Sequence, residues 1–353
     1  MKTLNKTLLA TAVGMAMTST AAQAEIELGK GISVTGFVDM SFVYTDVDGS
    51  DTTEKVFGVD QVEADFMYKG ADGVSAQVDI EYGEGDSGFS ADITDTDGDG
   101  VVDVDEVETS GDSSKTFVEQ AFITKAVSDE FSLKAGRFLS YSGWETEEPT
   151  GLYQYSGTGY GGFFYGGYQQ GVSAYFDGAG VDLMASVVNA LAGDVEDDTT
   201  QLGVELGVAV EPMEGMTAKL FYLAEGDDEL INFWASMSVE ALTLAVEYNV
   251  AEYAKGTEFE VGDAMIDSDE GSGYLLMANY AIDAFGITLR YHDFEIENET
   301  GATTLENDAI TIAPSYAVSD NLLIVAEYRM DTVSMGGADT DVDTFALEAL
   351  YTY

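Results

Sequence analysis

Alternation of apolar and polar residues along nearly the whole chain constrains the fold more than any other feature of this sequence. In LTLAVEYNV (242–250), Leu242, Leu244 and Val246 fall on one face of an extended chain, and Glu247 falls on the other. A period of two residues is that of a β-strand with one apolar face. The pattern recurs in about sixteen segments of roughly 8 to 13 residues, which predicts an all-β protein. The segments lie near 32–45, 57–69, 73–82, 116–126, 131–138, 170–177, 180–188, 201–211, 216–224, 230–239, 242–252, 272–281, 286–295, 307–317, 322–331 and 342–353.

The connections between these segments alternate in length. Short ones, such as Gly70 to Asp72 and Pro212 to Gly215, alternate with acidic, Gly-rich ones, the longest near 83–115, 139–169 and 253–271. An even number of strands with short turns on one side and long loops on the other is typical of a transmembrane antiparallel β-barrel. A soluble, secreted β-protein would show the same alternation, so this alternative stays open. Aromatic residues at the ends of apolar faces favour the barrel; they include Phe42, Tyr44, Tyr68, Tyr82, Tyr222, Tyr248, Tyr280, Tyr291 and Tyr328.

The N-terminus reads as a secretory signal peptide. Lys2 and Lys6 precede a short apolar run, and Ala22 and Ala24 form an expected cleavage site after residue 24. Residues 25–353 then form one domain. Cleavage leaves 66 acidic residues against 11 of the 13 basic ones, and such a surface excludes nucleic acid as a partner. The chain has no cysteine, so stability must come from burial or from a closed hydrogen-bonded sheet.

The stretch DTDGDGVVDVDE (95–106) has the spacing of an EF-hand calcium loop. Its oxygen ligands would come from Asp95, Asp97, Asp99, the carbonyl of Val101, Asp103 and Glu106, with Gly100 at the sharp turn. The flanks lack the helical period of a true EF-hand. We therefore expect a structural calcium ion that orders the extracellular loop 83–115, although acidic residues are common enough here to produce such spacing by chance.

If the apolar face meets lipid, the polar face lines the lumen. Acidic lumen candidates are Asp39, Glu63, Asp65, Asp79, Glu81, Glu205, Glu247, Glu327 and Glu348. Basic candidates are fewer: Lys219, Arg290, Arg329 and Arg137, the last after a break in the alternation at Gly136. Loop 139–169 carries Glu145, Glu147 and Glu148, which would form a constriction if the loop folds inward and would be solvated at the rim if it does not.

The sequence offers little for catalysis. His292 is the only histidine, and the chain contains no Gly-x-Ser-x-Gly motif and no paired-His metal motif. We therefore expect no enzyme and no organic cofactor.

The signal peptide, the opening strand GISVTGFVDMSFVYTD, LKAGRF at 133–138 and the aromatic last strand FALEALYTY resemble those of Gram-negative porins. GWETEEPTGLYQYS at 143–156 is similar to the OmpL-like group of β-barrel porins. The resemblance implies an outer-membrane diffusion channel for small hydrophilic solutes, allows a homotrimer, and leaves the solute open. With a mostly negative lumen we predict a weak preference for cations. The alternative is a calcium-dependent surface-binding protein that uses the barrel as an anchor.

Overall fold

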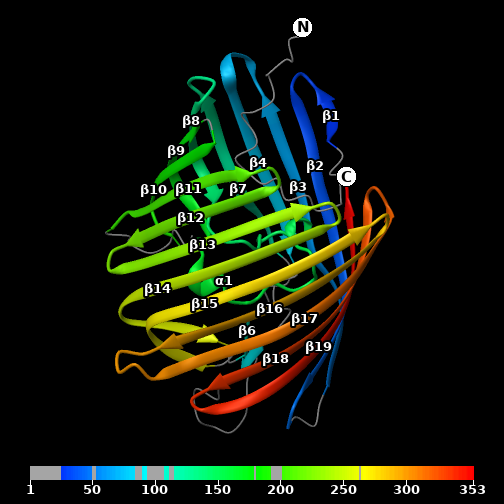
Figure 1. Ribbon diagram of the computed structural model, residues 1–353, viewed down its shortest axis with the longest axis vertical. Coiled ribbons are helices and arrows are strands. Elements are labelled where there is room, and N and C mark those ends of the chain that lie inside the picture. The colour runs from blue at the N-terminus through cyan, green and yellow to red at the C-terminus, as the bar shows by residue number, and fades with distance from the viewer. Residues whose placement is uncertain are drawn as a thin grey trace.

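The computed structural model describes residues 25–49, 53–83, 90–93, 107–110, 115–178, 180–191, 201–261 and 264–353, and most of these lie in β-strands (Figure 1). The strands are β1 (Ile26–Gly29), β2 (Ile32–Val47), β3 (Thr53–Lys69), β4 (Val74–Gly83), β5 (Ser90–Ile93), β6 (Val107–Ser110), β7 (Lys115–Ala126), β8 (Phe131–Leu139), β9 (Tyr168–Asp177), β10 (Val181–Val188), β11 (Gly203–Met213), β12 (Met216–Glu225), β13 (Asp228–Val239), β14 (Leu242–Val261), β15 (Ala264–Ile282), β16 (Phe285–Glu297), β17 (Thr303–Ser319), β18 (Leu322–Met335) and β19 (Ala338–Thr352). Short helical turns are η1 (Ala71–Gly73), η3 (Pro149–Gly151) and α1 (Gly161–Phe164). The predicted signal peptide and the predicted calcium loop 95–106 lie outside the described residues.

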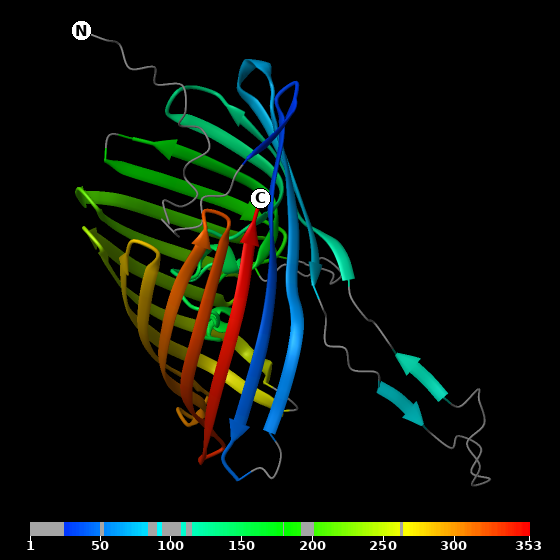
Figure 2. The same ribbon diagram turned by 90° about the vertical axis from the view of Figure 1, so that its right-hand side faces the viewer.

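The strands close into a barrel. The main sheet has 17 strands, one of which is the four-residue β1 on β2; the other sixteen pair antiparallel in chain order, and β19 pairs with β2. Strands β5 and β6 pair only with each other, in a ribbon beyond β4 and β7 (Figure 2). Closure leaves the sixteen-strand wall without an exposed edge, which is how backbone polar groups are satisfied across a membrane. The predicted barrel is confirmed.

Side chains alternate across this wall as the sequence predicts, with the apolar set outside. Leu244, Leu276, Leu289 and Ile310 expose between 45% and 51% of their surface, whereas Glu247 on the other face is fully buried. A soluble sandwich would bury the apolar set and expose the polar one, so this wall is built for lipid. Four of the aromatic residues predicted at strand ends, Tyr68, Tyr248, Tyr280 and Tyr328, are 41% to 50% exposed. Among the described residues, no helix has the length and apolarity to cross a membrane.

One predicted loop is largely strand. The segment 253–271 was expected as a long connection, but β14 continues to Val261 and β15 begins at Ala264. A register shift between Glu252 and Thr257 interrupts the pairing. The extension is stabilised from inside, where Phe259 packs against Tyr253 at 5.0 Å and against Phe163 at 4.9 Å between ring centroids. The stretch Ala254 to Glu258 between these two aromatics does not alternate, which hid the strand.

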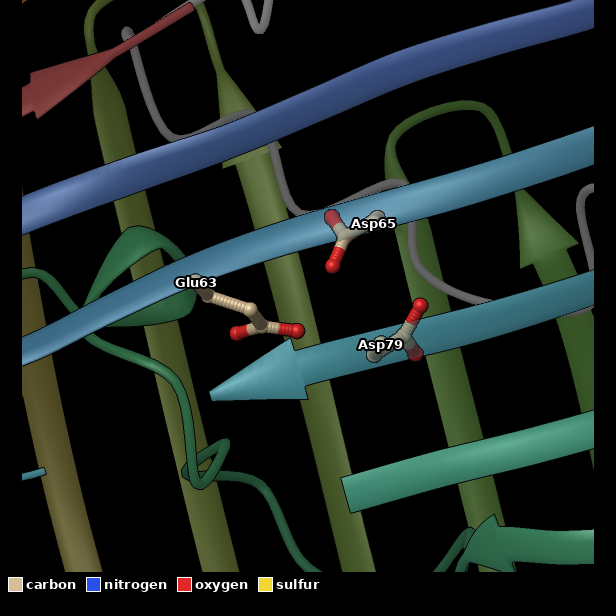
Figure 3. A group of neighbouring side chains, drawn as sticks. All are labelled: Glu63, Asp65 and Asp79. Carbon is tan, nitrogen blue, oxygen red and sulfur yellow. The ribbon is translucent and has the colours of Figure 1, made fainter. Parts of the chain in front are cut away.

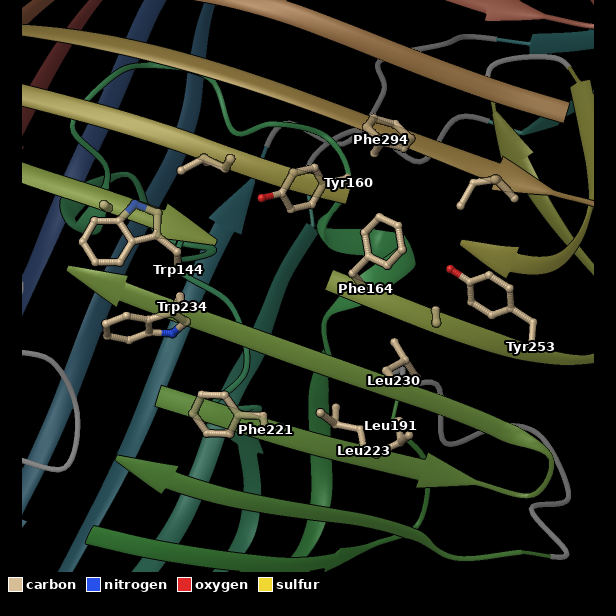
Figure 4. Close-up of a cluster of buried hydrophobic side chains, with 14 of the residues drawn as sticks. Trp144, Tyr160, Phe164, Leu191, Phe221, Leu223, Leu230, Trp234, Tyr253 and Phe294 are labelled. Carbon is tan, nitrogen blue, oxygen red and sulfur yellow. The ribbon is translucent and has the colours of Figure 1, made fainter. Parts of the chain in front are cut away.

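Residues 140–167, between β8 and β9, lie inside the barrel and are called the inner segment below (Figure 1). Its side chains Trp144, Tyr160 and Phe164 are at most 4% exposed and pack against inward side chains of the wall, including Trp234 and Phe294 (Figure 4). The Trp144 and Trp234 rings meet edge to face at 5.2 Å. The apolar core of this protein therefore lies in the lumen, between the inner segment and side chains of β8–β10 and β12–β17.

Candidate pore constriction

Glu247 of β14 is the main acceptor for the inner segment. Its carboxylate accepts hydrogen bonds from the backbone N–H of Trp144 at 2.8 Å, from the Tyr160 hydroxyl at 2.6 Å and from the Tyr165 hydroxyl. Asn232 of β13 donates to the same carboxylate at 2.6 Å. Burial beside Glu247 raises the pKa of Tyr160 well above its ordinary range, so this hydroxyl stays a donor. These four hydrogen bonds offset the cost of burying the Glu247 carboxylate.

A second attachment pairs Glu145 with Arg290 of β16. Arg290 Nη1 lies 2.6 Å from Glu145 Oε1, and the two side chains are 0% and 7% exposed. The same guanidinium donates to the carbonyl of Ser156 and, at 3.1 Å, to Thr311 Oγ1. Because a buried ion pair repays desolvation only with further hydrogen bonds, these contacts fix the inner segment against β16.

Arg329 of β18 is held in a similar way. It makes two bonds to Asp331, at 2.8 and 2.6 Å, and donates to the carbonyl of Thr158 at 3.2 Å. Next to it, Glu327 accepts the backbone N–H of Ser156 at 3.1 Å. Most donors of the two lumen arginines are therefore directed at the inner segment, at a neighbouring carboxylate or at Thr311, and Arg290 Nε is buried without a partner.

The inner segment also contacts β2 and β3, the first two strands of the barrel wall. The Tyr155 hydroxyl lies 3.3 Å from Asp60 of β3 and 3.2 Å from Ser41 of β2. With its contacts to β13, β14, β16 and β18, the segment crosses the lumen. A cavity of about 350 Å³ remains beside it, lined by Asp39 and Gln61 of the wall and by Thr146, Glu147, Pro149, Leu152, Tyr155, Ser156 and Gly157 of the segment.

Buried carboxyl groups collect on one side of this lumen. Asp39, Glu63, Asp79 and Glu119, on β2, β3, β4 and β7, are each at most 4% exposed. Glu148 of the inner segment lies among them, and burial with the charges of Asp65 and Glu119 raises the pKa of Glu148 to about 8. Around the barrel, the carboxylates on β2–β7 therefore follow the arginines on β16 and β18, and β19 alone separates β18 from β2.

Most of the predicted site residues lie on the inner face. Glu145, Glu147 and Glu148 lie on the inner segment, Lys219 stacks over the Trp234 ring at 4.8 Å, and Arg290 and Arg329 are described above. Of the predicted acidic set, the buried members are Asp39, Glu63, Asp65, Asp79, Glu205, Glu247, Glu327 and Glu348, whereas Glu81 is half-buried. The six predicted calcium ligands Asp95, Asp97, Asp99, Val101, Asp103 and Glu106 lie outside the described residues.

Arg137 is a correction. Arg137 pairs in register with Ala121 and Gln170. Two residues earlier on the same strand, Ala135 pairs with Ile123 and Val172, which face outward with 58% and 52% of their surface exposed. The alternation therefore continues through Gly136 and places Arg137 on the outer face. Its Nε donates to the carbonyl of Glu119 at 2.9 Å, and its guanidinium lies 5.6 Å from the Tyr168 ring.

Sequence reasoning missed several residues of the site. Asn232, Tyr160 and Tyr165 hold Glu247, and Asp60 holds Tyr155. The only signal was the run GTGYGGFFYGGY at 157–168, too rich in aromatic residues for a solvated loop. His292 lies in this core: its Nε2 is 2.8 Å from Asn307 Oδ1 and its ring stacks edge-on to Tyr160 at 6.0 Å.

Comparisons with known proteins agree with this architecture. The sequence profile of the Gram-negative porin family matches residues 10–336. No curated protein matches the chain. The comparisons do not single out the OmpL-like group, so that finer resemblance stays a prediction.

Similar solved structures include OmpF of Salmonella typhi in complex with daunomycin, with a TM-score of 0.65, 14% identity, and coverage of 94% of this chain and 100% of that chain. The anion-selective porin from Comamonas acidovorans has a TM-score of 0.62 at 13% identity, over 91% of this chain and 99% of that one. In-vitro folded OmpT of Vibrio cholerae in its trimer form has a TM-score of 0.57 at 13% identity, over 92% of this chain and 100% of that chain. At identities this low, the similarity shows that these structures and this chain share a fold, and it shows nothing more.

Proposed function

This chain belongs to the Gram-negative porin family and resides in the outer membrane as a channel, and from that premise we propose that it conducts small hydrophilic solutes passively, with a weak preference for cations. The inner segment serves as the constriction, and no energy source or organic cofactor is involved. Family and fold indicate a channel rather than an enzyme.

The observation that carries the cation preference is that the lumen arginines are largely engaged by hydrogen-bonding partners, whereas several lumen carboxylates have unpaired oxygens. Arg290 and Arg329 direct most of their donors at carboxylates and backbone carbonyls, which offsets much of their field, although Arg290 Nε is buried without a partner. Asp39 and Glu63 have buried oxygens without a hydrogen-bonding partner. In a narrow lumen of low dielectric constant, such carboxylates favour cations over anions.

The solute path we propose passes between the inner segment and β2–β3. That is where the cavity of about 350 Å³ lies, and Asp39 and Glu147 face it from opposite sides. A permeating cation would meet both carboxylates at the narrow point.

We also propose a homotrimer with β8–β10 at the interface. These strands have nine, ten and eight residues. At about 3.3 Å per residue and a tilt of about 40°, they rise only about 20 to 25 Å, at or below the apolar band of about 25 Å. Their outer face also carries polar Arg137, Gln170 and Asn189 around a hollow of about 480 Å³. A neighbouring protein would cover this part of the wall better than lipid would.

The calcium ion in loop 83–115 stays a proposal based on the sequence spacing. The alternative function, calcium-dependent surface binding, is not taken further, because its loop residues lie outside the described part of the chain.

The test of the pore is the reversal potential of the refolded mature protein in a planar bilayer under a KCl gradient. We expect stepwise conductance with a cation-directed potential, reduced in the double variant Asp39→Asn/Glu147→Gln. Asp320→Asn, in the exposed turn between β17 and β18, is the matched control and should keep the wild-type potential. An anion-directed potential would overturn the proposed selectivity, and a folded barrel without conductance would overturn the channel.

A further inference from the structure

Five carboxylates gather where β3, β4 and β7 meet the inner segment. One oxygen each of Glu63, Asp65 and Asp79 lie within 4.8 Å of one another, and the same holds for Glu63, Glu119 and Glu148. Figure 3 shows the three side chains of the first group close together on the neighbouring strands β3 and β4. Glu63 belongs to both groups and so lies at the centre.

The hydrogen bonds around this cluster leave its facing oxygens unpaired. Thr35 donates to Asp65 Oδ2 at 2.9 Å, and Gln77 and Gln120 both donate to Asp79 Oδ2, at 2.9 and 2.8 Å. Asp65 Oδ1, Asp79 Oδ1 and both oxygens of Glu63 are buried without a donor. Glu63 is 1% exposed, so its unpaired carboxylate is aimed into a closed space rather than into open solvent.

Lys134 of β8 compensates this charge only in part, through its electrostatic interaction with Asp79. Its ammonium lies in an aromatic pocket, 4.3 Å from the Phe122 ring centroid, and donates to the Tyr141 hydroxyl at 2.6 Å. Four ion pairs of the described residues lie elsewhere: Glu25 with Lys69, Glu299 with Lys255, Glu145 with Arg290, and Asp331 with Arg329. Carboxylates buried with so few donors and so little counter-charge are costly unless they take up a proton or bind a cation.

The donor chemistry selects a hard divalent cation. All the facing atoms are carboxylate oxygens, with no nitrogen or sulfur, which suits Ca²⁺ or Mg²⁺. Ca²⁺ binds oxygen at about 2.3 to 2.6 Å, so two oxygens on one ion lie at most about 5 Å apart, as both groups allow. Mg²⁺ requires a near-ideal octahedron of shorter bonds, whereas Ca²⁺ accepts the irregular set that two strands and a loop provide.

We propose that Glu63, Asp65 and Asp79 bind a calcium ion in the lumen, with Glu119 and Glu148 as further ligands through the shared Glu63. Thr35, Gln77 and Gln120 orient these ligands by holding their outer oxygens. Because Glu148 belongs to the inner segment, the ion joins that segment to the β3–β4–β7 wall, on the side away from Glu247. This site is distinct from the calcium loop predicted at 95–106.

The test is isothermal titration of the chelator-treated, refolded full-length barrel with CaCl2 in 0.1 M KCl. Glu63→Gln keeps shape and removes the shared ligand. Removing a group that merely orients a ligand costs about 10- to 100-fold in metal affinity, so Glu63→Gln is expected to lose at least that much. The matched control is Asp97→Asn/Asp99→Asn, which disables the predicted loop site and should retain the lumen site.

Loss of one binding component in Glu63→Gln, with its retention in the loop control, supports the lumen site. Wild-type binding in Glu63→Gln, or loss of all binding in the loop control, overturns it. Heat-modifiable gel mobility checks that each variant is folded, and Asp79→Asn provides the same test if Glu63→Gln does not fold. The readout is calcium binding, so the result does not depend on conductance or selectivity.

Discussion

Replacing Glu247 by alanine should release the inner segment from the wall without unfolding the barrel. The carboxylate accepts from Trp144, Tyr160 and Tyr165 of the segment, and alanine offers none of these donors an acceptor. The backbone pairing of β14 with β13 and β15 is untouched by the change. The effect should therefore fall on the docking of the segment.

The magnitude follows from the three lost bonds. A hydrogen bond to a charged group contributes about 1.5 to 3 kcal/mol, so three contribute about 4 to 9 kcal/mol. Water in the lumen can hydrogen-bond to the freed donors, so we expect a loss near the lower end of this range. At about 1.4 kcal/mol per tenfold, 4 kcal/mol raises the undocked fraction on the order of 10³-fold.

Chymotrypsin is the suitable probe, since the inner segment contains no lysine or arginine but many aromatic residues. When cleavage is slow compared with redocking, its rate follows the undocked population, so Glu247→Ala should be cut within 140–167 at least about 100-fold faster than wild type. Its single-channel conductance should rise. The control is Glu348→Ala, since Glu348 is also a buried strand glutamate, and the charged group that acts on it most strongly is Asp39 of the wall. Equal resistance of Glu247→Ala and wild type would refute the docking role.

Three further changes test other parts of the structure. Arg290→Met leaves Glu145 buried without its partner, which costs about 3 to 5 kcal/mol of docking free energy; the KCl reversal potential should become more cation-directed, and an unchanged potential would contradict this. Leu289→Arg places a charge on the lipid face and should lower the folding free energy in vesicles by about 2 to 4 kcal/mol, measured by urea titration against Leu289→Ala. Gly36→Ala puts a Cβ 2.1 Å from the carbonyl oxygen of Glu63, an overlap that should cost about 1 to 3 kcal/mol in the same titration; wild-type stability would show that the wall yields there.

The wall was predictable because lipid acts on each strand separately. A strand such as β16 needs an apolar outer face whatever its neighbours are, so alternation alone reveals it, and all sixteen predicted segments correspond to strands of the barrel. The pattern failed at 253–271, where Tyr253 and Phe259 pack on Phe163 of the inner segment. That partner is about ninety residues away in the chain, and local periodicity carries no information about it.

The inner face was predictable, but its pairings were not. Alternation places Glu247 and Arg290 inside, yet nothing local joins Arg290 to Glu145, which is 145 residues away. The pairing depends on the path of the inner segment, and that path is set by packing of Trp144, Tyr160 and Phe164. Arg137 shows the opposite error: Gly136 looked like a break in the alternation, but the register with Ala121 shows that the strand continues.

The placement of the few basic residues explains why this lumen should respond to cations. Among the described basic residues that face inward, Arg290 and Arg329 bind the inner segment, while Lys134 and Lys219 lie over aromatic rings. Positive charge is thus used to build the constriction and is not left to balance the carboxylates of β2–β7. Neutralisation of those carboxylates must then come from protons or from cations in solution. Weak cation preference and a bound calcium ion are two consequences of that same imbalance, one for mobile ions and one for an ion held at Glu63.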